Sequence, residues 1–162
     1  MVIRWSKIIL VAAIAFHCLL VVFGNITDYY SNHDLVERAL SMKEVFPEAT
    51  ITYRAISNPI LHHAAYLTII SFEMLTALFC LFGAWQLFRV RSAAPPIFNH
   101  AKKWSVVGLT LGIITWQVLF RSVGGEWFGM WMSAVLNSAL ASAFHISIML
   151  LAMLIYVTVK DD

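Results

Sequence analysis

Four long apolar stretches separated by shorter polar stretches dominate the pattern of this chain. They cover roughly residues 7–25, 59–88, 100–120 and 131–159. Each is long enough to cross the hydrocarbon core of a bilayer, which takes about 20 helical residues. Because lipid offers no partner to backbone N–H and C=O groups, each stretch must be a helix. The pattern predicts an all-α membrane protein, a four-transmembrane-helix bundle that forms one integral membrane domain over residues 1–162.

Basic residues are unevenly distributed between the two predicted faces. One face collects most of them, and the opposite face carries most of the acidic residues as well as four basic ones. The positive-inside rule therefore predicts that both termini are cytoplasmic and that the connections at about 26–58 and 121–131 lie on the outer face. The basic residues of the predicted cytoplasmic face are Arg4, Lys7, Arg89, Arg91, Lys102, Lys103 and Lys160.

The two outer connections are predicted to form a cap. The first is too long for a plain connector, and Asp34-Leu-Val-Glu37 has the spacing of a capping box. Apolar residues follow at near-helical intervals until Pro47. This predicts a short amphipathic helix that lies on the membrane surface or on the second connection, or that simply covers the end of the bundle. The second connection combines three glycines with two tryptophans, which predicts a structured loop at the membrane face.

Seven polar or aromatic residues of these connections share the outer face and are expected to hold the cap together. Arg121 and Glu126 are expected to form an ion pair, which contributes about 1 kcal/mol or less at a wet surface. The seven residues are Asn25, Asp28, Tyr29, Arg54, Arg121, Glu126 and Trp127.

Composition agrees with a membrane protein and excludes one class of partner. The chain is 60% hydrophobic and only 12% charged, whereas soluble domains are about a quarter charged. The net charge of +2 and the absence of a dense basic cluster argue against a nucleic-acid partner. Cys18 and Cys80 both lie inside apolar stretches, so they are expected to be packed thiols.

Polar residues inside the apolar stretches are candidates for function. Glu73 is expected about 20 Å below the outer face, at ~1.5 Å per helical residue. A carboxyl group at that depth must be neutral, paired or in contact with water. Thr76, Asn137 and Ser138 are its candidate partners; a structural hydrogen bond, a proton or cation relay, and contact with a partner subunit or a quinone all remain open. Gln117 is a further intramembrane polar residue, expected to pack beneath the second connection.

Histidines raise two further hypotheses. His17 and His145 on different helices are candidate haem ligands. They are expected about 12 and 21 Å below the outer ends of their helices, at ~1.5 Å per residue, so a shared haem b is disfavoured. His33, His62 and His63 are candidate metal ligands near the outer face. Because neighbouring histidines of a helix point in different directions, no metal site is predicted there.

Small residues predict one close helix contact. Gly108 and Gly112 have the four-residue spacing that lets membrane helices approach closely. Ala134, Ser138 and Ser142 repeat that spacing in the last apolar stretch. The two stripes are expected to face each other.

Four segments carry a resemblance to a known family. They are Asn25-Ile-Thr-Asp-Tyr-Tyr-Ser-Asn32, Tyr53-Arg-Ala-Ile-Ser57, Tyr66 through Glu73, and Gly124-Gly-Glu-Trp-Phe-Gly-Met-Trp131. Together they resemble a family of small predicted integral membrane proteins of Proteobacteria, a domain of unknown function. The resemblance covers nearly the whole chain. It implies four membrane helices and a bacterial inner membrane, and it brings no catalytic residue.

The sequence favours a non-enzymatic role, because no nucleophile, base and orienting group occur in a recognisable pattern and no glycine-rich phosphate loop precedes a helix. The leading hypothesis is an accessory or assembly subunit of a larger membrane complex, such as a respiratory complex, with partner subunits or further copies of the chain. One alternative is transport of protons, ions or small solutes through Glu73. Another is a redox protein that binds haem or a quinone.

Overall fold

The computed structural model describes residues 1–162 as an all-helical chain without strands. Four segments are long and apolar enough to cross a membrane: α1, α3, the stretch Pro95–Trp127, and α6. The predicted four-helix architecture is confirmed. The helical elements are α1 (Val2–Thr27), α2 (Tyr29–Ser41), η1 (Thr52–Arg54), α3 (Pro59–Arg89), α4 (Pro95–Ala101), α5 (Lys103–Ile113), η2 (Ile114–Trp127), η3 (Met130–Met132) and α6 (Ala134–Thr158).

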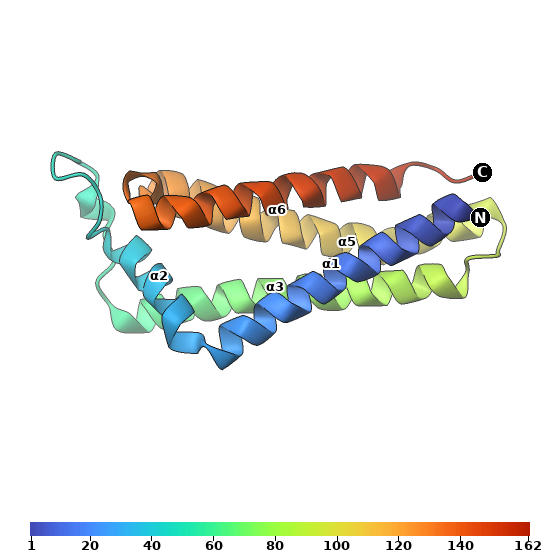
Figure 1. The fold of residues 1–162 in the computed structure, drawn as a ribbon, viewed down its shortest axis with the longest axis horizontal. Helices are drawn as coiled ribbons and strands as arrows, with labels where there is room; N and C mark the ends of the chain where they lie inside the picture. Colours follow the sequence, from blue (N-terminus) through green and yellow to red (C-terminus); the bar gives the residue numbers. More distant parts are fainter.

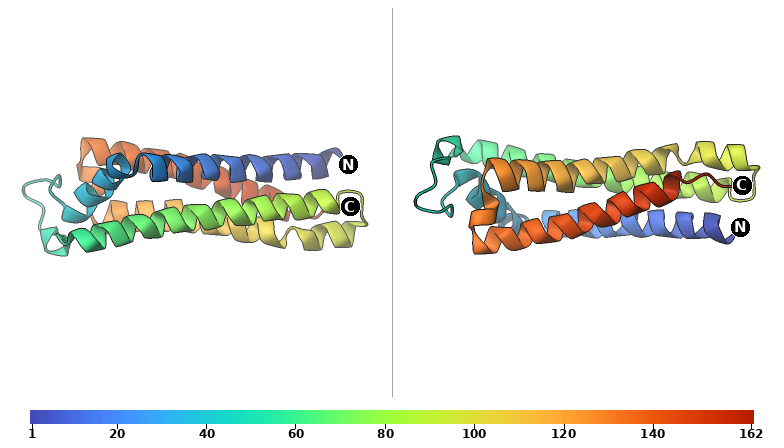
Figure 2. Two further views of the ribbon diagram at one scale, coloured as in Figure 1. Left: turned by 90° about the horizontal axis from the view of Figure 1, so that it is seen from below. Right: turned by 90° about the horizontal axis from the view of Figure 1, so that it is seen from above.

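The four long segments lie side by side along the longest axis of the molecule (Figure 1). α1 packs on α3, α3 packs on α5, and α6 packs on α5 and η2 (Figure 2). Both termini lie at one end, here called the terminal end, and α2 lies at the opposite end, here called the α2 end (Figure 1). α1 and α6 converge at the terminal end and diverge toward the α2 end (Figure 1).

Glycines allow α3 and α5 to approach closely. A Cβ atom on Gly83 of α3 would lie 2.5 Å from the backbone nitrogen of Ser105 of α5. A Cβ atom on Gly108 of α5 would lie 2.7 Å from the backbone nitrogen of Cys80 of α3. Both distances are too short for any side chain, so the close α3–α5 contact requires glycine at these positions.

The predicted contact between the two small-residue stripes is wrong. Gly108 faces α3, and Gly112 lies between Leu150 of α6 and Thr76 of α3. The stripe of α6 that was expected to meet them is exposed on the outside of the bundle. Four-residue spacing indicates that a helix can be approached closely, but it does not identify the neighbour. The exposed residues are Ala134, Ser138 and Ser142.

A buried ionic cluster closes the terminal end. The carboxylate of Asp161 accepts hydrogen bonds from Lys7 at 2.6 Å and Lys102 at 2.5 Å. Both ammonium groups also donate to the carbonyl of Val159 at 2.6 Å. Burial opposes ionisation of Asp161, but the hydrogen bonds from Lys102 and Lys7 outweigh it and hold the pKa of its carboxyl below the ordinary value. The cluster joins α1, the start of α5 and the chain that follows α6.

The cap helix begins earlier than the sequence predicted. α2 starts at Tyr29, directly after the turn at Asp28, and it ends at Ser41, so the prediction of a capping box at Asp34 is wrong. Asp34 lies inside the helix, where its carboxylate is 3.4 Å from the guanidinium of Arg38 one turn later. The same acidic spacing that indicates a helix start also occurs within a helix, as an i,i+4 ion pair.

The second connection also differs from the prediction of a loop over residues 121–131. The helix continues as η2, a π-helix, through Trp127, and only Gly129 adopts a left-handed conformation, with φ of 67°. Gly124 and Gly125 serve packing instead of turning: Cβ atoms there would lie 2.5 Å from Met130 Sδ and 3.3 Å from a methyl carbon of Leu140.

A polar contact fastens the chain after α2 to the start of α6. Ser133 caps α6 by accepting a hydrogen bond from the Leu136 N–H at 3.3 Å, and its hydroxyl donates to Glu44. Arg38 forms an ion pair with the same carboxylate. The hydrogen bond from Ser133, with a smaller contribution from Arg38, holds the pKa of Glu44 below its ordinary value.

Candidate ligand site

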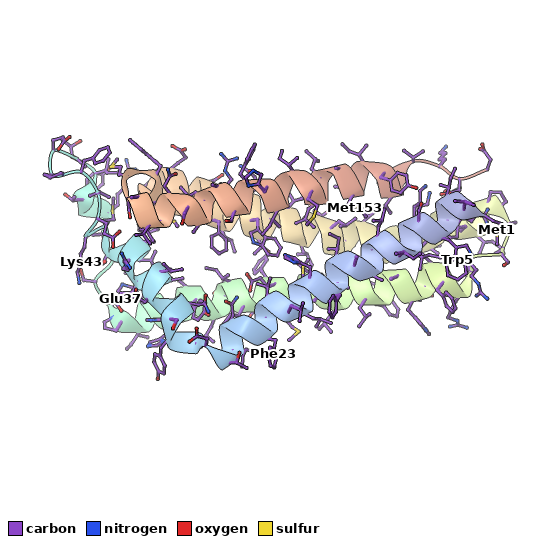
Figure 3. All side chains as sticks on the ribbon, viewed as in Figure 1. Met1, Trp5, Phe23, Glu37, Lys43 and Met153 are labelled. Atoms are coloured by element: carbon purple, nitrogen blue, oxygen red, sulfur yellow. The ribbon has the colours of Figure 1, made fainter.

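A cavity of about 250 Å³ lies near the α2 end, between α2, α3, η2 and the start of α6. It is lined by 17 residues, 13 of them hydrophobic, and is partly open. Glu37 and Lys43 mark the α2 end of the molecule, and Met1 and Trp5 mark the terminal end (Figure 3). The cavity therefore lies far from the ionic cluster around Asp161.

The predicted amphipathic helix supplies one wall of the cavity. Leu35, Val36, Ala39 and Leu40 of α2 line it, at the spacing that places apolar residues on one helical face. α2 packs on α3 and α1, as predicted for a helix that covers the end of the bundle. The facing wall comes from one side of α3, which includes Ala65.

The polar atoms of the lining come from uncharged side chains, and no charged residue lines the cavity. The Tyr66 hydroxyl donates to the backbone carbonyl of Asn25 at 3.0 Å. The Thr68 hydroxyl donates to the carbonyl of Ala64 at 2.8 Å. The Asn32 amide donates to the carbonyl of Asp28 at 3.0 Å. The cavity is thus an apolar chamber with a few hydroxyl and amide groups.

Asn25 connects the cavity to the buried carboxyl group of Glu73. Its Nδ2 donates to Glu73 Oε2 at 2.7 Å, and Glu73 is only 2% exposed. Sequence reasoning placed Asn25 in the outer cap. Because α1 continues to Thr27, Asn25 instead lies within the helix, beside α3.

The predicted partners of Glu73 are wrong. The Thr76 hydroxyl donates to the carbonyl of Phe72 at 2.8 Å, one turn earlier in the same helix. Asn137 and Ser138 are exposed on α6, so neither faces the carboxyl group. The signal that could have found Asn25 is the apolar Ile26 after it, which allows the first helix to continue past residue 25.

The other predicted cap residues form several separate contacts. Arg54 donates to the Trp127 carbonyl at 3.3 Å and stacks over its indole ring at 4.5 Å. The predicted ion pair of Arg121 with Glu126 is absent. Arg121 lies 4.5 Å from the Phe144 ring and 3.5 Å from Gln117 Oε1, and Glu126 is exposed.

Histidines and tyrosines hold α2 against α3 beside the cavity. The rings of His33 and His63 stack at 4.1 Å between centroids, and the Tyr29 hydroxyl is 2.8 Å from His63 Nδ1. Burial, followed by the neighbouring His63, lowers the pKa of His33. His62 Nε2 is 2.8 Å from the Ile56 carbonyl. No group of three or more histidine, cysteine or acidic side chains is arranged to hold a metal ion.

His17 and His145 do not have the difference in depth that the sequence suggested. α1 ends at Thr27 and α6 begins at Ala134, which places the two histidines about 15 and 17 Å from those ends at ~1.5 Å per residue. His17 Nε2 is buried without a hydrogen-bond partner, whereas His145 is exposed on α6. Neither lines the cavity.

Comparison with known families decides the broad class of the protein. Residues 3–160 match the family described as predicted small integral membrane protein (DUF2165). The chain belongs to this family. It is therefore an integral membrane protein in contact with a lipid bilayer, and the resemblance noted from its four sequence segments is confirmed. Neither the curated proteins nor the solved structures contain a match.

Proposed function

We propose that this protein binds a neutral, lipid-soluble small molecule in the cavity between α2, α3, η2 and α6. The main support for the proposal is the cavity itself, which has a volume of about 250 Å³, predominantly apolar walls and no charged lining residue. Ligand sites are typically apolar, with a few placed polar groups, and have volumes of about 300–1,000 Å³. At about 250 Å³ the cavity is slightly smaller than this range. It therefore suits a ring-sized head group, with any long tail outside it.

The chemistry of the lining defines the ligand class. A charged head group would lose hydration without gaining a counter-charge, which disfavours anionic and cationic ligands. The amides of Asn25 and Asn32 and the hydroxyls of Tyr66 and Thr68 favour a head group with carbonyl or hydroxyl oxygens. A quinone ring and its reduced form fit this description.

The proposed setting is a bacterial inner membrane with both termini in the cytoplasm. The basic residues near the terminal end support this orientation. The cavity would then lie in the outer half of the membrane, where a lipid-soluble molecule could enter from the bilayer.

Ligand binding is better supported than conduction through Glu73. Between Glu73 and the terminal end, α3 and α5 are in close contact at Gly83 and Gly108, and Ala77, Cys80 and Leu87 of α3 are completely buried. This close packing argues against a water-filled path between α3 and α5 on the terminal side of the carboxyl group.

An accessory or assembly role remains the second proposal. Large apolar side chains are exposed on all four long segments. Contact with lipid accounts for such a surface in a membrane protein, and no part of it is distinguished as a site for a partner subunit. Co-purification of a stoichiometric partner from native membranes would support this role.

Filling the cavity should weaken binding. Ala65→Phe places a ring in the cavity, and we expect the affinity for decylubiquinone to fall by about tenfold or more, which corresponds to ~1.4 kcal/mol. The measurement is a titration of purified protein in nanodiscs, followed by quenching of tryptophan fluorescence.

Ala64→Phe is the matched control, because Ala64 is the preceding residue of α3 and is exposed away from the cavity. Its affinity should stay close to that of the wild-type protein. Equal affinities for the two variants, or no saturable binding by the wild-type protein, would contradict the proposal.

A further inference from the structure

The side chain of Asn25 has a defined orientation at the edge of the cavity. Its Nδ2 donates to Glu73 Oε2 at 2.7 Å. Its Oδ1 makes no hydrogen bond within the protein and is not among the buried, unpartnered polar atoms. The nitrogen of the amide therefore faces the carboxyl group, and the carbonyl oxygen remains available to a ligand.

Two residues of α3 hold Asn25 in place. Glu73 fixes its side chain, and Tyr66 fixes its backbone by donating to its carbonyl oxygen at 3.0 Å. Tyr66 and Glu73 are both 2% exposed and lie about two turns apart on the same face of α3. An ionised Glu73 can only accept hydrogen bonds, so reversing the Asn25 amide would place its carbonyl oxygen against an accepting oxygen, and the ionised carboxylate favours the observed orientation.

The other polar groups of the cavity also offer mainly acceptors. The hydroxyl hydrogens of Tyr66 and Thr68 are already donated to backbone carbonyls. One N–H of Asn32 is donated to the carbonyl of Asp28. Each amide retains a single further N–H, whereas the oxygens of all four side chains keep free lone pairs. The cavity therefore has more acceptor than donor capacity.

We propose that Glu73 is a positioning residue that, through Asn25, makes the cavity prefer a hydroxyl-bearing ring, such as a quinol, over the corresponding carbonyl form. This inference rests on the proposed function and names the form of ligand that the site selects. A site that accepts a hydrogen bond from a ligand hydroxyl discriminates against the analogue that lacks it, because the acceptor is then left unpaired.

Binding of the two forms of one probe tests this preference. Affinities for decylubiquinol and decylubiquinone are measured under anaerobic conditions in nanodiscs, and the wild-type protein should bind the quinol about tenfold more tightly. In Glu73→Gln the new amide can present either its nitrogen or its oxygen to Asn25. The Asn25 amide can then reverse, and the ratio of the two affinities should fall toward one.

The ratio of the quinol affinity to the quinone affinity distinguishes a positioning role of Glu73 from a purely structural one. If Glu73 only stabilised the fold, its replacement would weaken binding of both forms equally and leave the ratio unchanged, which would overturn the inference. Asn25→Leu provides a second variant that removes one acceptor directly; it should also lower the ratio of quinol to quinone affinity, and an unchanged ratio would contradict the inference. If Glu73→Gln does not fold, Asn25→Leu tests the inference alone.

Failure of the inference can be distinguished from failure of the proposed function. If the wild-type protein binds both forms equally and Ala65→Phe weakens both, the cavity is a ligand site without the proposed selectivity. Tighter binding of the quinone than of the quinol would lead to the same conclusion. If the wild-type protein binds neither form saturably, the proposed function itself is wrong for quinones.

Discussion

Asp161→Ala is expected to lower the free energy of unfolding by about 3 kcal/mol. The variant leaves the ammonium groups of Lys7 and Lys102 buried without the carboxylate that accepts from both. Breaking a buried ion pair by removing one partner is costly, because the remaining charge has lost both its hydration and its counter-charge. Unfolding of the purified protein in mixed micelles, titrated with sodium dodecyl sulfate, measures the loss.

Asp162→Ala is the matched control, because Asp162 is exposed and its side chain takes part in no ion pair. We expect its stability to be that of the wild-type protein. Similar losses for the two variants would contradict a specific role for the Asp161 cluster.

The contribution of Asp161 should also depend on pH. The folded state depresses the pKa of its carboxyl, so the folded state favours the ionised form. This stabilisation is complete above the ordinary carboxyl pKa of about 3.9 and is lost as the pH falls through the lower folded value. The stability difference between wild type and Asp161→Ala should therefore shrink as the pH falls into the acid range.

Gly108→Ala is expected to destabilise the bundle by about 2 kcal/mol, even though alanine is the better helix former by about 1 kcal/mol. The new methyl group would lie 2.7 Å from the backbone nitrogen of Cys80. A backbone atom cannot move aside as a flexible side chain can, so α5 and α3 must separate. The same titration in mixed micelles measures the effect.

Gly24→Ala provides the comparison, because a Cβ atom on Gly24 has no neighbour within 4 Å. It should be neutral or slightly stabilising, as expected from helix propensity alone. A Gly108→Ala variant as stable as Gly24→Ala would show that the α3–α5 contact is looser than the structure indicates.

The membrane architecture could be predicted from the sequence, because hydropathy is a local property. A long apolar stretch must become a helix in lipid whatever surrounds it. The position of the cap helix was predicted only approximately, because the acidic spacing at Asp34 to Glu37 that indicated its start is equally compatible with the interior of a helix.

Contacts between distant residues could not be predicted in the same way. The partner of Glu73 depends on how α1 crosses α3, and this crossing brings Asn25, near the end of α1, to the carboxyl group. The Lys7–Asp161 pair joins opposite ends of the chain. Sequence patterns assign each residue to a helical face, but they do not say which helix lies opposite.

The cavity could not be predicted from the sequence either, because it also depends on contacts between distant segments. Its apolar residues look like ordinary helix-packing positions in the sequence, and the cavity exists because α2 covers the end of the bundle where α1 and α6 diverge (Figure 1). Glu73 could be recognised as unusual from its position in an apolar stretch. Its link to the cavity through Asn25 became visible only in the structure.

The most direct test of the ligand-binding account is to identify what the protein carries from its own membrane. Wild-type protein and Ala65→Phe are extracted gently into nanodiscs, and the bound small molecules are identified and quantified by mass spectrometry. We expect a neutral lipid-soluble molecule with a ring hydroxyl or carbonyl to accompany the wild-type protein in stoichiometric amount and to be depleted in Ala65→Phe. Recovery of phospholipid alone, in equal amounts from both proteins, would contradict the account.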